Sequence, residues 1–384
     1  RKFIRKNEFL DKSIKKEILK KRLIILGGSH DQTGTIKIAK NLLVRSIVFD
    51  KNVESPNIQL PDQFILKSAT KTREINYFAK KTGINGVILQ GPDFPQVSSK
   101  IESSLGVKNI PLSAAKICTD KYKMKVFLKK ILIPIPKFTL HKKRSFKKSN
   151  INFPVIIKPL DKSGSRGVFL CEKKKQFSNL VKRAFLETKK NFLQIEEYLN
   201  GPQISTETFI LNGKIFTPGF VDRNYELLKF TKPQIIENGG NYPSKHFEYY
   251  QEINQYIKKI AKSLKIRNGT IKGDIVIHKN KIYFIEVAVR LSGGDFSETI
   301  IPLSSSFNLI KNSINLALQN KIKKKDLKIK FKKNYIAHRY FFSKKGQLIN
   351  IYGLNKIKKK SWVKKIKIFK NKGDFLSHTT NHTN

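Results

Sequence analysis

The stretch GDIVIHKNKIYFIEVAVRLSGG, residues 273–294, has two apolar segments separated by a short polar turn at His278–Lys281. Apolar runs so closely spaced predict a β-hairpin. Asp274 and Glu286 lie on its two arms, and pairing across the turn brings such residues together on one face. The whole chain has only 28 acidic residues, and placing two inside apolar strands is costly unless a cation balances them.

This acidic pair predicts a site for a divalent cation. Carboxylate oxygens suit Mg²⁺ (or Mn²⁺), which binds one or two carboxylates together with phosphate oxygens and water. Arg290, four residues after Glu286, can bind phosphate through two parallel hydrogen bonds. We therefore expect Asp274 and Glu286 to be metal ligands, the alternative being a purely structural pair of acids.

A second motif, FPVIIKPLDKSGSRGV at 153–168, predicts a phosphate site. A buried strand delivers Lys158, and a loop of small residues at 161–167 follows it directly. Glycines let backbone N–H groups approach phosphate oxygens, and a cation at the strand end neutralises them. The motif is not the Walker pattern, which needs GK[ST] at the start of a helix. Taken alone, it is also compatible with a mobile hairpin carrying a stray lysine.

The third motif is QIEEYLNGP at 194–202, where two carboxylates precede a Gly-Pro turn. Such a segment can present one carboxylate and backbone groups to the edge of an adenine ring. Without the other motifs, a strand end with two solvated acids is the simpler interpretation.

The residues before these motifs predict an α/β unit. Short apolar segments at 23–26, 46–49 and 86–89 alternate with helical patterns at 34–43 and 71–82. This alternation is typical of a doubly wound parallel sheet. The Gly27-Gly28 turn does not fit the GxGxxG pattern, so we expect a tight turn there and not a dinucleotide site.

Further along the chain, the pattern predicts a helix over 119–130, then mainly strands and turns from Phe153. A strand-like segment follows at 335–342, and the polar end SHTTNHTN is expected to be disordered.

Together the three motifs resemble the ATP-grasp superfamily in their order and separation, over about residues 22–310. The resemblance is to its carboxylate–amine ligase branch, with features similar to biotin carboxylase and to L-amino acid ligases. Biotin carboxylase and its relatives also carry two acidic metal ligands twelve residues apart, with an arginine four further on. The resemblance implies a doubly wound α/β domain followed by a two-lobed ATP-grasp domain (α+β). The implied divisions are a basic helical extension at 1–21, a pre-ATP-grasp domain at 22–112, a small lobe at 113–194, a large lobe at 195–320 and a lysine-rich extension at 321–384.

The resemblance also implies individual roles. CTDKYKMKVFLKKILIPIPKF, at 118–138, is similar to the family's segment that enters the nucleotide site. The implied ATP-binding residues are Lys121, Lys158, Asp161, Ser163, Gly164, Ser165, Gly167, Glu196, Glu197, Leu199 and Gln203. The metal ligands are Asp274 and Glu286, the catalytic residues are Arg290 and Lys158, and the substrate-binding residues are Arg223, Gly293 and Gly294. A surface position for Arg223 is equally compatible with its sequence.

Two residues depart from the family's pattern. Ala288 stands where the family commonly has Asn, which predicts thinner metal coordination or a water in its place. Gln203 stands where the ribose-binding acid usually follows the Gly-Pro turn, which predicts weaker ATP binding.

The implied reaction uses ATP and Mg²⁺ to activate a small carboxylate as an acyl phosphate, which an amine then attacks, releasing ADP and phosphate. Phosphoryl transfer needs positioning and charge neutralisation more than a nucleophilic side chain. Two other readings stay open: biotin-type carboxylation, and a basic nucleic-acid-binding protein on a degenerate ATP-grasp scaffold. A homodimer is also left open.

The net charge of +50 comes from lysines spread along all 384 residues, which favours compositional bias with weak affinity for anions or nucleic acid. No apolar run approaches the roughly 20 residues that span a bilayer. The basic start lacks the apolar region of a signal peptide, and two cysteines without CxxC spacing favour a cytoplasmic location.

Overall fold

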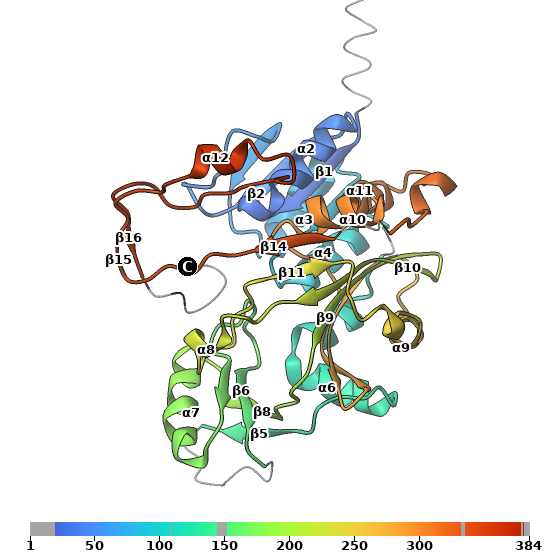
Figure 1. Ribbon diagram of the computed structural model, residues 1–384. Helices are drawn as coiled ribbons and strands as arrows, with labels where there is room; N and C mark the ends of the chain where they lie inside the picture. Colours follow the sequence, from blue (N-terminus) through green and yellow to red (C-terminus); the bar gives the residue numbers. More distant parts are fainter. Residues whose placement is uncertain (1–19, 108, 144–151, 332–334, 378, 380–384) are drawn as a thin grey trace, which may run out of the picture.

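The computed structural model describes residues 20–107, 109–143, 152–331, 335–377 and 379. The helix expected near the start of the chain and most of the polar end fall outside these ranges. Figure 1 shows a parallel sheet at one end of the molecule, an antiparallel sheet in the middle and a small lobe at the other end.

The N-terminal unit is a four-stranded parallel sheet in the order β3-β2-β1-β4. Its strands are β1 (Arg22–Leu26), β2 (Arg45–Asp50), β3 (Gln63–Leu66) and β4 (Gly86–Leu89), and its helices are α2 (Thr33–Asn41), α3 (Thr72–Lys81) and α4 (Pro95–Ser104). Leu23 to Leu26 are all fully buried, because a central parallel strand is covered on both faces. The predicted doubly wound parallel sheet is confirmed.

The middle of the molecule is a six-stranded sheet in the order β13-β12-β9-β10-β11-β14. Its strands are β9 (Gln203–Leu211), β10 (Lys214–Arg223), β11 (Gly239–Tyr242), β12 (Gly269–His278), β13 (Lys281–Ala288) and β14 (Ile336–Arg339), and all neighbours are antiparallel. Helix α9 (Tyr250–Ser263) packs on this sheet through Ile253, Ile257 and Ile260. Other helices along this stretch of the chain include α8 (Leu228–Thr231), the π-helix η4 (Phe296–Ile300), α10 (Ile301–Ser305) and α11 (Leu309–Ala317).

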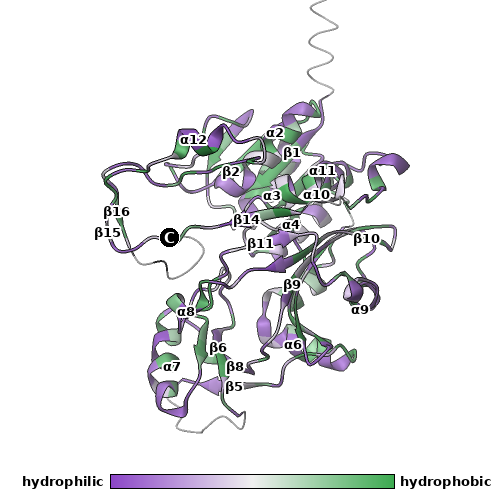
Figure 2. Ribbon diagram, in the orientation of Figure 1, coloured by the Kyte–Doolittle hydropathy of each residue, from purple (hydrophilic) through white to green (hydrophobic). Residues whose placement is uncertain are grey.

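The small lobe is a four-stranded antiparallel sheet in the order β5-β8-β6-β7. It contains β5 (Phe138–Lys142), β6 (Val155–Pro159), β7 (Phe169–Cys171), β8 (Phe192–Glu197) and helix α7 (Phe177–Leu186). Leu180, Val181 and Ala184 of α7 join the strands in a separate hydrophobic cluster. Figure 2 shows hydrophobic residues along β6 and a mixture of hydrophobic and hydrophilic residues on α7, as expected for a helix that covers one face of a sheet.

The helix expected over 119–130 is confirmed, and it begins two residues later than expected. The structure has two helices, α5 (Leu112–Thr119) and α6 (Lys121–Lys130), and Asp120 separates them. The Asp120 side chain accepts a hydrogen bond from the backbone N–H of Lys123, which caps the new helix. Both helices pack against the six-stranded sheet, through residues such as Cys118 and Met124.

The N-terminal unit shares a hydrophobic core with a distant part of the chain. Leu23 and Ile25 of β1 cluster with Ile310 and Ile314 of α11 and with Phe209 of β9. One face of the parallel sheet is therefore covered by residues almost 300 positions later in the sequence.

The C-terminal residues return across the molecule. After β14 they form the short pair β15 (Gly346–Gln347) and β16 (Phe375–Leu376) and the helix α12 (Leu354–Lys358). Lys365 and Lys367 of this segment form ion pairs with Asp295 at the start of η4. Across the described ranges, no helix combines the length and apolar character needed to cross a bilayer.

Candidate active site

The predicted hairpin is confirmed, and its two acids are direct neighbours. β12 and β13 pair in antiparallel register with Asp274 opposite Glu286. The turn is Lys279-Asn280, both in the left-handed conformation that suits a two-residue hairpin. The twelve-residue spacing thus brings the two carboxylates to one cross-strand position.

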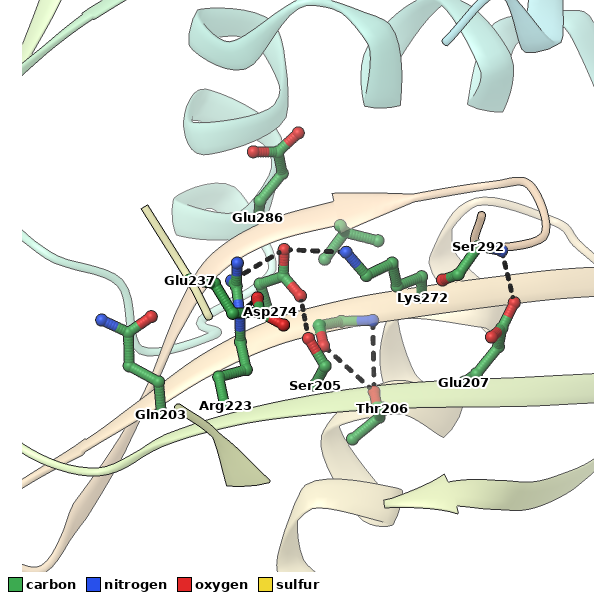
Figure 3. Close-up of polar contacts among 12 residues, drawn as sticks. Gln203, Ser205, Thr206, Glu207, Arg223, Glu237, Lys272, Asp274, Glu286 and Ser292 are labelled. Atoms are coloured by element: carbon green, nitrogen blue, oxygen red, sulfur yellow. Dashed lines mark hydrogen bonds and ion pairs between the residues drawn. The ribbon is translucent and has the colours of Figure 1, made fainter. Parts of the chain in front are cut away.

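Cations surround Asp274 in this structure. Its Oδ2 lies 3.0 Å from Lys272 Nζ and 3.3 Å from an Arg223 guanidinium nitrogen, and its Oδ1 accepts a hydrogen bond from Ser205 Oγ. Figure 3 shows Lys272 and Arg223 on the two sides of the carboxylate. Burial by itself would raise the pKa of Asp274, but Lys272 and Arg223 hold that pKa well below its usual value. Asp274 therefore stays ionised.

Glu286 is more accessible than Asp274. The Glu286 side chain is 29% exposed, against 12% for Asp274, and its Oε1 lies 3.7 Å from Lys121 Nζ. Burial opposes ionisation of Glu286, yet Lys121 and Lys158 lower its pKa below the ordinary value. Within the described ranges, no group of three or more His, Cys, Asp or Glu side chains could hold a metal ion. A two-carboxylate site still fits Mg²⁺, because this ion completes its shell with water and phosphate.

Lys158 points into a buried charge cluster of the small lobe. Its Nζ lies 2.7 Å from Glu196 Oε1, and Lys125 Nζ lies 3.4 Å from the same oxygen. Lys125 is fully buried and also donates a hydrogen bond to the carbonyl of Phe284, on β13. Burial would raise the pKa of Glu196, but the two ammonium groups lower it. The predicted contact of Glu196 with adenine stays a prediction, while the structure gives this carboxylate two lysine partners.

Lys121 joins the two sheets at the site. It is the first residue of α6, and its ammonium donates to the carbonyl oxygen of Lys162 while facing Glu286. The loop at 161–167 thus begins beside the acidic pair. Within this loop Gly164, Ser165 and Gly167 all adopt the left-handed conformation, for which glycine is suited.

Two hydrogen bonds shape the start of this loop. Asp161 accepts from the Thr188 hydroxyl at 2.6 Å, and the carbonyl of Ser163 accepts from Arg166 Nε at 3.2 Å. The start of the predicted phosphate loop is therefore tied to Thr188, and Arg166 forms a hydrogen bond within the loop.

The adenine segment connects the two sheets. Glu197 ends β8, Leu199 is buried, and Gln203 begins β9. The Gln203 amide oxygen accepts a hydrogen bond from the Tyr225 hydroxyl at 3.0 Å. At Gly201, a Cβ would lie 1.9 Å from the carbonyl oxygen of Ile277, so only glycine fits the Gly-Pro turn.

Neither predicted arginine is a free surface group. Arg223, whose side chain is 14% exposed, pairs with Glu237 as well as with Asp274, so the surface reading is wrong. Arg290 Nε lies 3.4 Å from Asp93 Oδ1 of the N-terminal unit, and the side chain is 12% exposed. The guanidinium of Arg290 is thus held four residues beyond Glu286, at the boundary between the parallel sheet and the site.

Gly293 and Gly294 contact the loop that follows β1. The backbone N–H of Gly294 donates to Asp31 Oδ1 at 2.7 Å. A Cβ at Gly293 would lie 2.1 Å from Asp31 Oδ2, and one at Gly294 would lie 2.6 Å from the Tyr340 hydroxyl oxygen. The double glycine therefore lets the N-terminal unit close against this end of the site.

Several residues near the site were not predicted, among them Lys125, Lys272, Glu237 and Asp31. Two of them had a signal in the sequence. Lys125 follows Lys121 by one helical turn, and Lys272 precedes Asp274 by two strand positions, which puts each pair on one face. Glu237 and Asp31 meet the site only through tertiary contacts.

Residues 118–294, which include the acidic pair, the lysines and the loop, match the family profile described as ATP-grasp domain. This match covers somewhat less than half of the chain. The L-amino acid ligase from Bacillus licheniformis shares its fold with a TM-score of 0.80 at 17% identity, covering 93% of this chain and 89% of that one.

Two further comparisons are with a solved structure and with a sequence relative. The biotin carboxylase domain of the Hydrogenobacter thermophilus 2-oxoglutarate carboxylase, in complex with MgADP, ADP and bicarbonate, gives a TM-score of 0.67 at 15% identity, covering 82% of this chain and 73% of that one. The carbamoyl phosphate synthase large chain of Clostridium botulinum (strain Loch Maree / Type A3) is 24% identical over 299 residues, covering 71% of this chain. This chain spans 27% of the length of that relative.

Proposed function

We propose that this protein is an ATP- and Mg²⁺-dependent ligase that activates a small carboxylate as an acyl phosphate and joins it to an amine. The observation that carries the proposal is the position of Lys121. Its ammonium contacts both the carbonyl of Lys162, in the predicted phosphate loop, and Glu286, in the acidic pair. A phosphate group between loop and acids would therefore meet a cation already held in place.

The ATP site in this proposal lies between the small lobe and the six-stranded sheet. Lys121 and Lys158 neutralise phosphate oxygens, and backbone N–H groups of the loop at 161–167 add further donors. Glu196, Glu197, Leu199 and Gln203 border the base and ribose. The structural neighbour from Hydrogenobacter thermophilus was solved with MgADP, which supports a nucleotide at this fold position.

Asp274 and Glu286 would hold Mg²⁺, which supplies charge neutralisation of the phosphates when bound. Glu286 is the better ligand of the two, because three groups already contact the Asp274 carboxylate. Ala288 offers no oxygen, so water completes the shell.

In the first step the substrate carboxylate oxygen attacks the γ-phosphorus of ATP, the bond to the β-phosphate oxygen breaks, and ADP leaves. In the second step the amine nitrogen attacks the acyl carbon, phosphate leaves and the amine loses a proton. Arg290 and Lys158 would stabilise the negative charge that develops on the transferring group. Arg223, Gly293 and Gly294 border the substrate region in this proposal.

The proposed domain boundaries lie near residues 112, 194 and 320. They separate the pre-ATP-grasp domain, the small lobe, the large lobe and the C-terminal extension.

Trapping the intermediate tests this proposal. Purified protein would be incubated with ATP, Mg²⁺, hydroxylamine and a panel of amino acids, other small acids and bicarbonate. We expect hydroxamate and ADP in equal amounts with the correct carboxylate, and amide product when the correct amine replaces hydroxylamine. ATP hydrolysis without any hydroxamate would contradict the ligase assignment. Bicarbonate-dependent ADP release alone would instead favour carboxylation.

A further inference from the structure

Six side chains on one face of the six-stranded sheet form a regular array around the acidic pair. Alternate residues of a strand share a face, and the register aligns Asp274 with Ser205 and Glu286, and Lys272 with Glu207 and Ala288. The array therefore has two rows across the strands β9, β12 and β13. One row is Ser205, Asp274 and Glu286, and the other is Glu207, Lys272 and Ala288.

Lys272 occupies the centre of the second row. The Glu207 carboxylate, which already accepts hydrogen bonds from other groups, lies on one side, and the Ala288 methyl group lies on the other. Glu207 accepts hydrogen bonds from the Ser292 backbone N–H at 2.7 Å and from the Ser297 hydroxyl at 2.9 Å. Ala288 presents no polar atom. The Lys272 ammonium turns to Asp274 instead, at 3.0 Å, and the side chain remains 22% exposed (Figure 3).

Most hydrogen-bond acceptor positions of the Asp274 carboxylate are already occupied. An ionised carboxylate offers about four acceptor positions. Ser205, Lys272 and Arg223 together contact three of them, and two of these partners are cations. A divalent ion that binds Asp274 must therefore share this carboxylate with the Lys272 ammonium, and the two positive charges repel each other.

We propose that Lys272 is a built-in cation of the metal site, which competes with the divalent ion for Asp274 and sets how tightly that ion is held. This inference rests on the proposed function of Asp274 and Glu286 as metal ligands. Lys272 supplies positive charge beside Asp274 whether or not the metal is bound. The ion is consequently held mainly through Glu286, and the site works with weak metal affinity.

The test is the binding of Mn²⁺ in the presence of a non-hydrolysable ATP analogue, with free Mn²⁺ measured by electron paramagnetic resonance. Lys272→Met keeps most of the length of the side chain and removes its charge, and we expect Mn²⁺ to bind roughly tenfold more tightly. Lys281→Met is the matched control, because Lys281 is an exposed lysine at the turn end of the same hairpin. The Mn²⁺ affinity of this variant should equal that of the wild type.

A second pair of variants examines the position opposite Lys272. Ala288→Asn places an amide oxygen on the same face as Glu286. Alone it should change Mn²⁺ affinity less than twofold, because the ammonium still lies opposite. Combined with Lys272→Met it should tighten binding several-fold beyond the single variant, so the two substitutions are not additive.

Unchanged or weaker Mn²⁺ binding in Lys272→Met would overturn the inference, because Lys272 would then merely hold Asp274 in place. Lys272→Gln should match Lys272→Met, and it decides the question if the methionine variant fails to fold. The ligase proposal can fail separately. If the trapping experiment gives no hydroxamate while the Mn²⁺ affinities change as expected, the proposed reaction is wrong but the role of Lys272 stands. Absence of Mn²⁺ binding in every variant, wild type included, would overturn both.

Discussion

Lys158 and Glu196 form an ion pair inside the small lobe, with Nζ 2.7 Å from Oε1 and both side chains at most 5% exposed. Lys125 shares the same carboxylate oxygen, at 3.4 Å. One acid thus balances two buried ammonium groups, one from the strand β6 and one from the helix α6. This contact joins the small lobe to the part of the chain that packs on the large sheet.

Glu196→Gln should therefore destabilise the protein. Removing one partner of a buried pair leaves uncompensated charge, which typically costs about 3–5 kcal/mol. Chemical denaturation would measure the free energy of unfolding. Glu197→Gln is the control, since the neighbouring side chain is partly exposed and an amide oxygen can still accept from the backbone N–H of Lys137. Equal stability of the two variants would contradict the buried charge cluster.

Glu286→Gln and Asp274→Asn should each abolish most turnover while the fold survives, because each removes a ligand beside the triphosphate. Glu286→Gln should also weaken Mn²⁺ binding more than Asp274→Asn does, since Asp274 is already held by Lys272 and Arg223. Steady-state rates and Mn²⁺ titrations measure the two effects. Full activity in Glu286→Gln would eliminate the metal assignment, and a large fall of the unfolding temperature in both variants would indicate a structural role.

Lys121→Ala and Lys158→Ala should weaken ATP binding or slow transfer by roughly 10²-fold or more, as expected when a group that stabilises the transferring phosphate is removed. Lys173 and Lys174 are exposed lysines of the same lobe, and their substitution should have little effect. Calorimetric titration with ATP compares the four variants once circular dichroism has shown them folded. Similar losses at all four positions would mean that general charge, and not a site, attracts the nucleotide.

The loop at 161–167 should become protected from proteolysis when ATP and Mg²⁺ are added. Its N–H groups would then close over phosphate oxygens, and lids of this kind order on binding. Arg166 is exposed and offers trypsin a cleavage site inside the loop, so the rate of cleavage there is the measurement. Cleavage at Lys279, in the hairpin turn, serves as the reference and should not slow. Equal rates with and without nucleotide would show that the loop does not cover the ligand.

Glu102 should make stability depend on pH. Burial raises the pKa of this carboxyl to about 8 from its ordinary value of 4.5, so the folded state holds a proton that the unfolded state releases. The stabilisation is fully present below pH 4.5 and is lost as the pH rises through about 8, by an amount on the order of 3 kcal/mol or more. Glu102→Gln mimics the protonated form, and denaturation at pH 5 and pH 8.5 should show a smaller difference than in the wild type. An identical pH dependence would remove Glu102 as its source.

The sequence predicted what depends on local pattern. The hairpin and the pairing of Asp274 with Glu286 follow from a two-residue turn and the alternation of a strand. Local sequence patterns also predicted the loop after Lys158 and the parallel N-terminal sheet. The sequence did not reveal which charges would meet, because Arg223 contacts Glu237 and Asp274 only after β10, β11 and β12 assemble. The contact of Asp31 with Gly294 joins residues 263 positions apart, a separation that no local pattern encodes.

The cover that α11 provides for the parallel sheet has a consequence for synthesis of the chain. Ile310 and Ile314, which bury Leu23 and Ile25, are synthesised nearly 300 residues after them. At a translation rate of roughly 5–20 residues per second, one apolar face of the sheet stays uncovered for tens of seconds. Nascent chains should therefore expose this face to chaperones until α11 emerges.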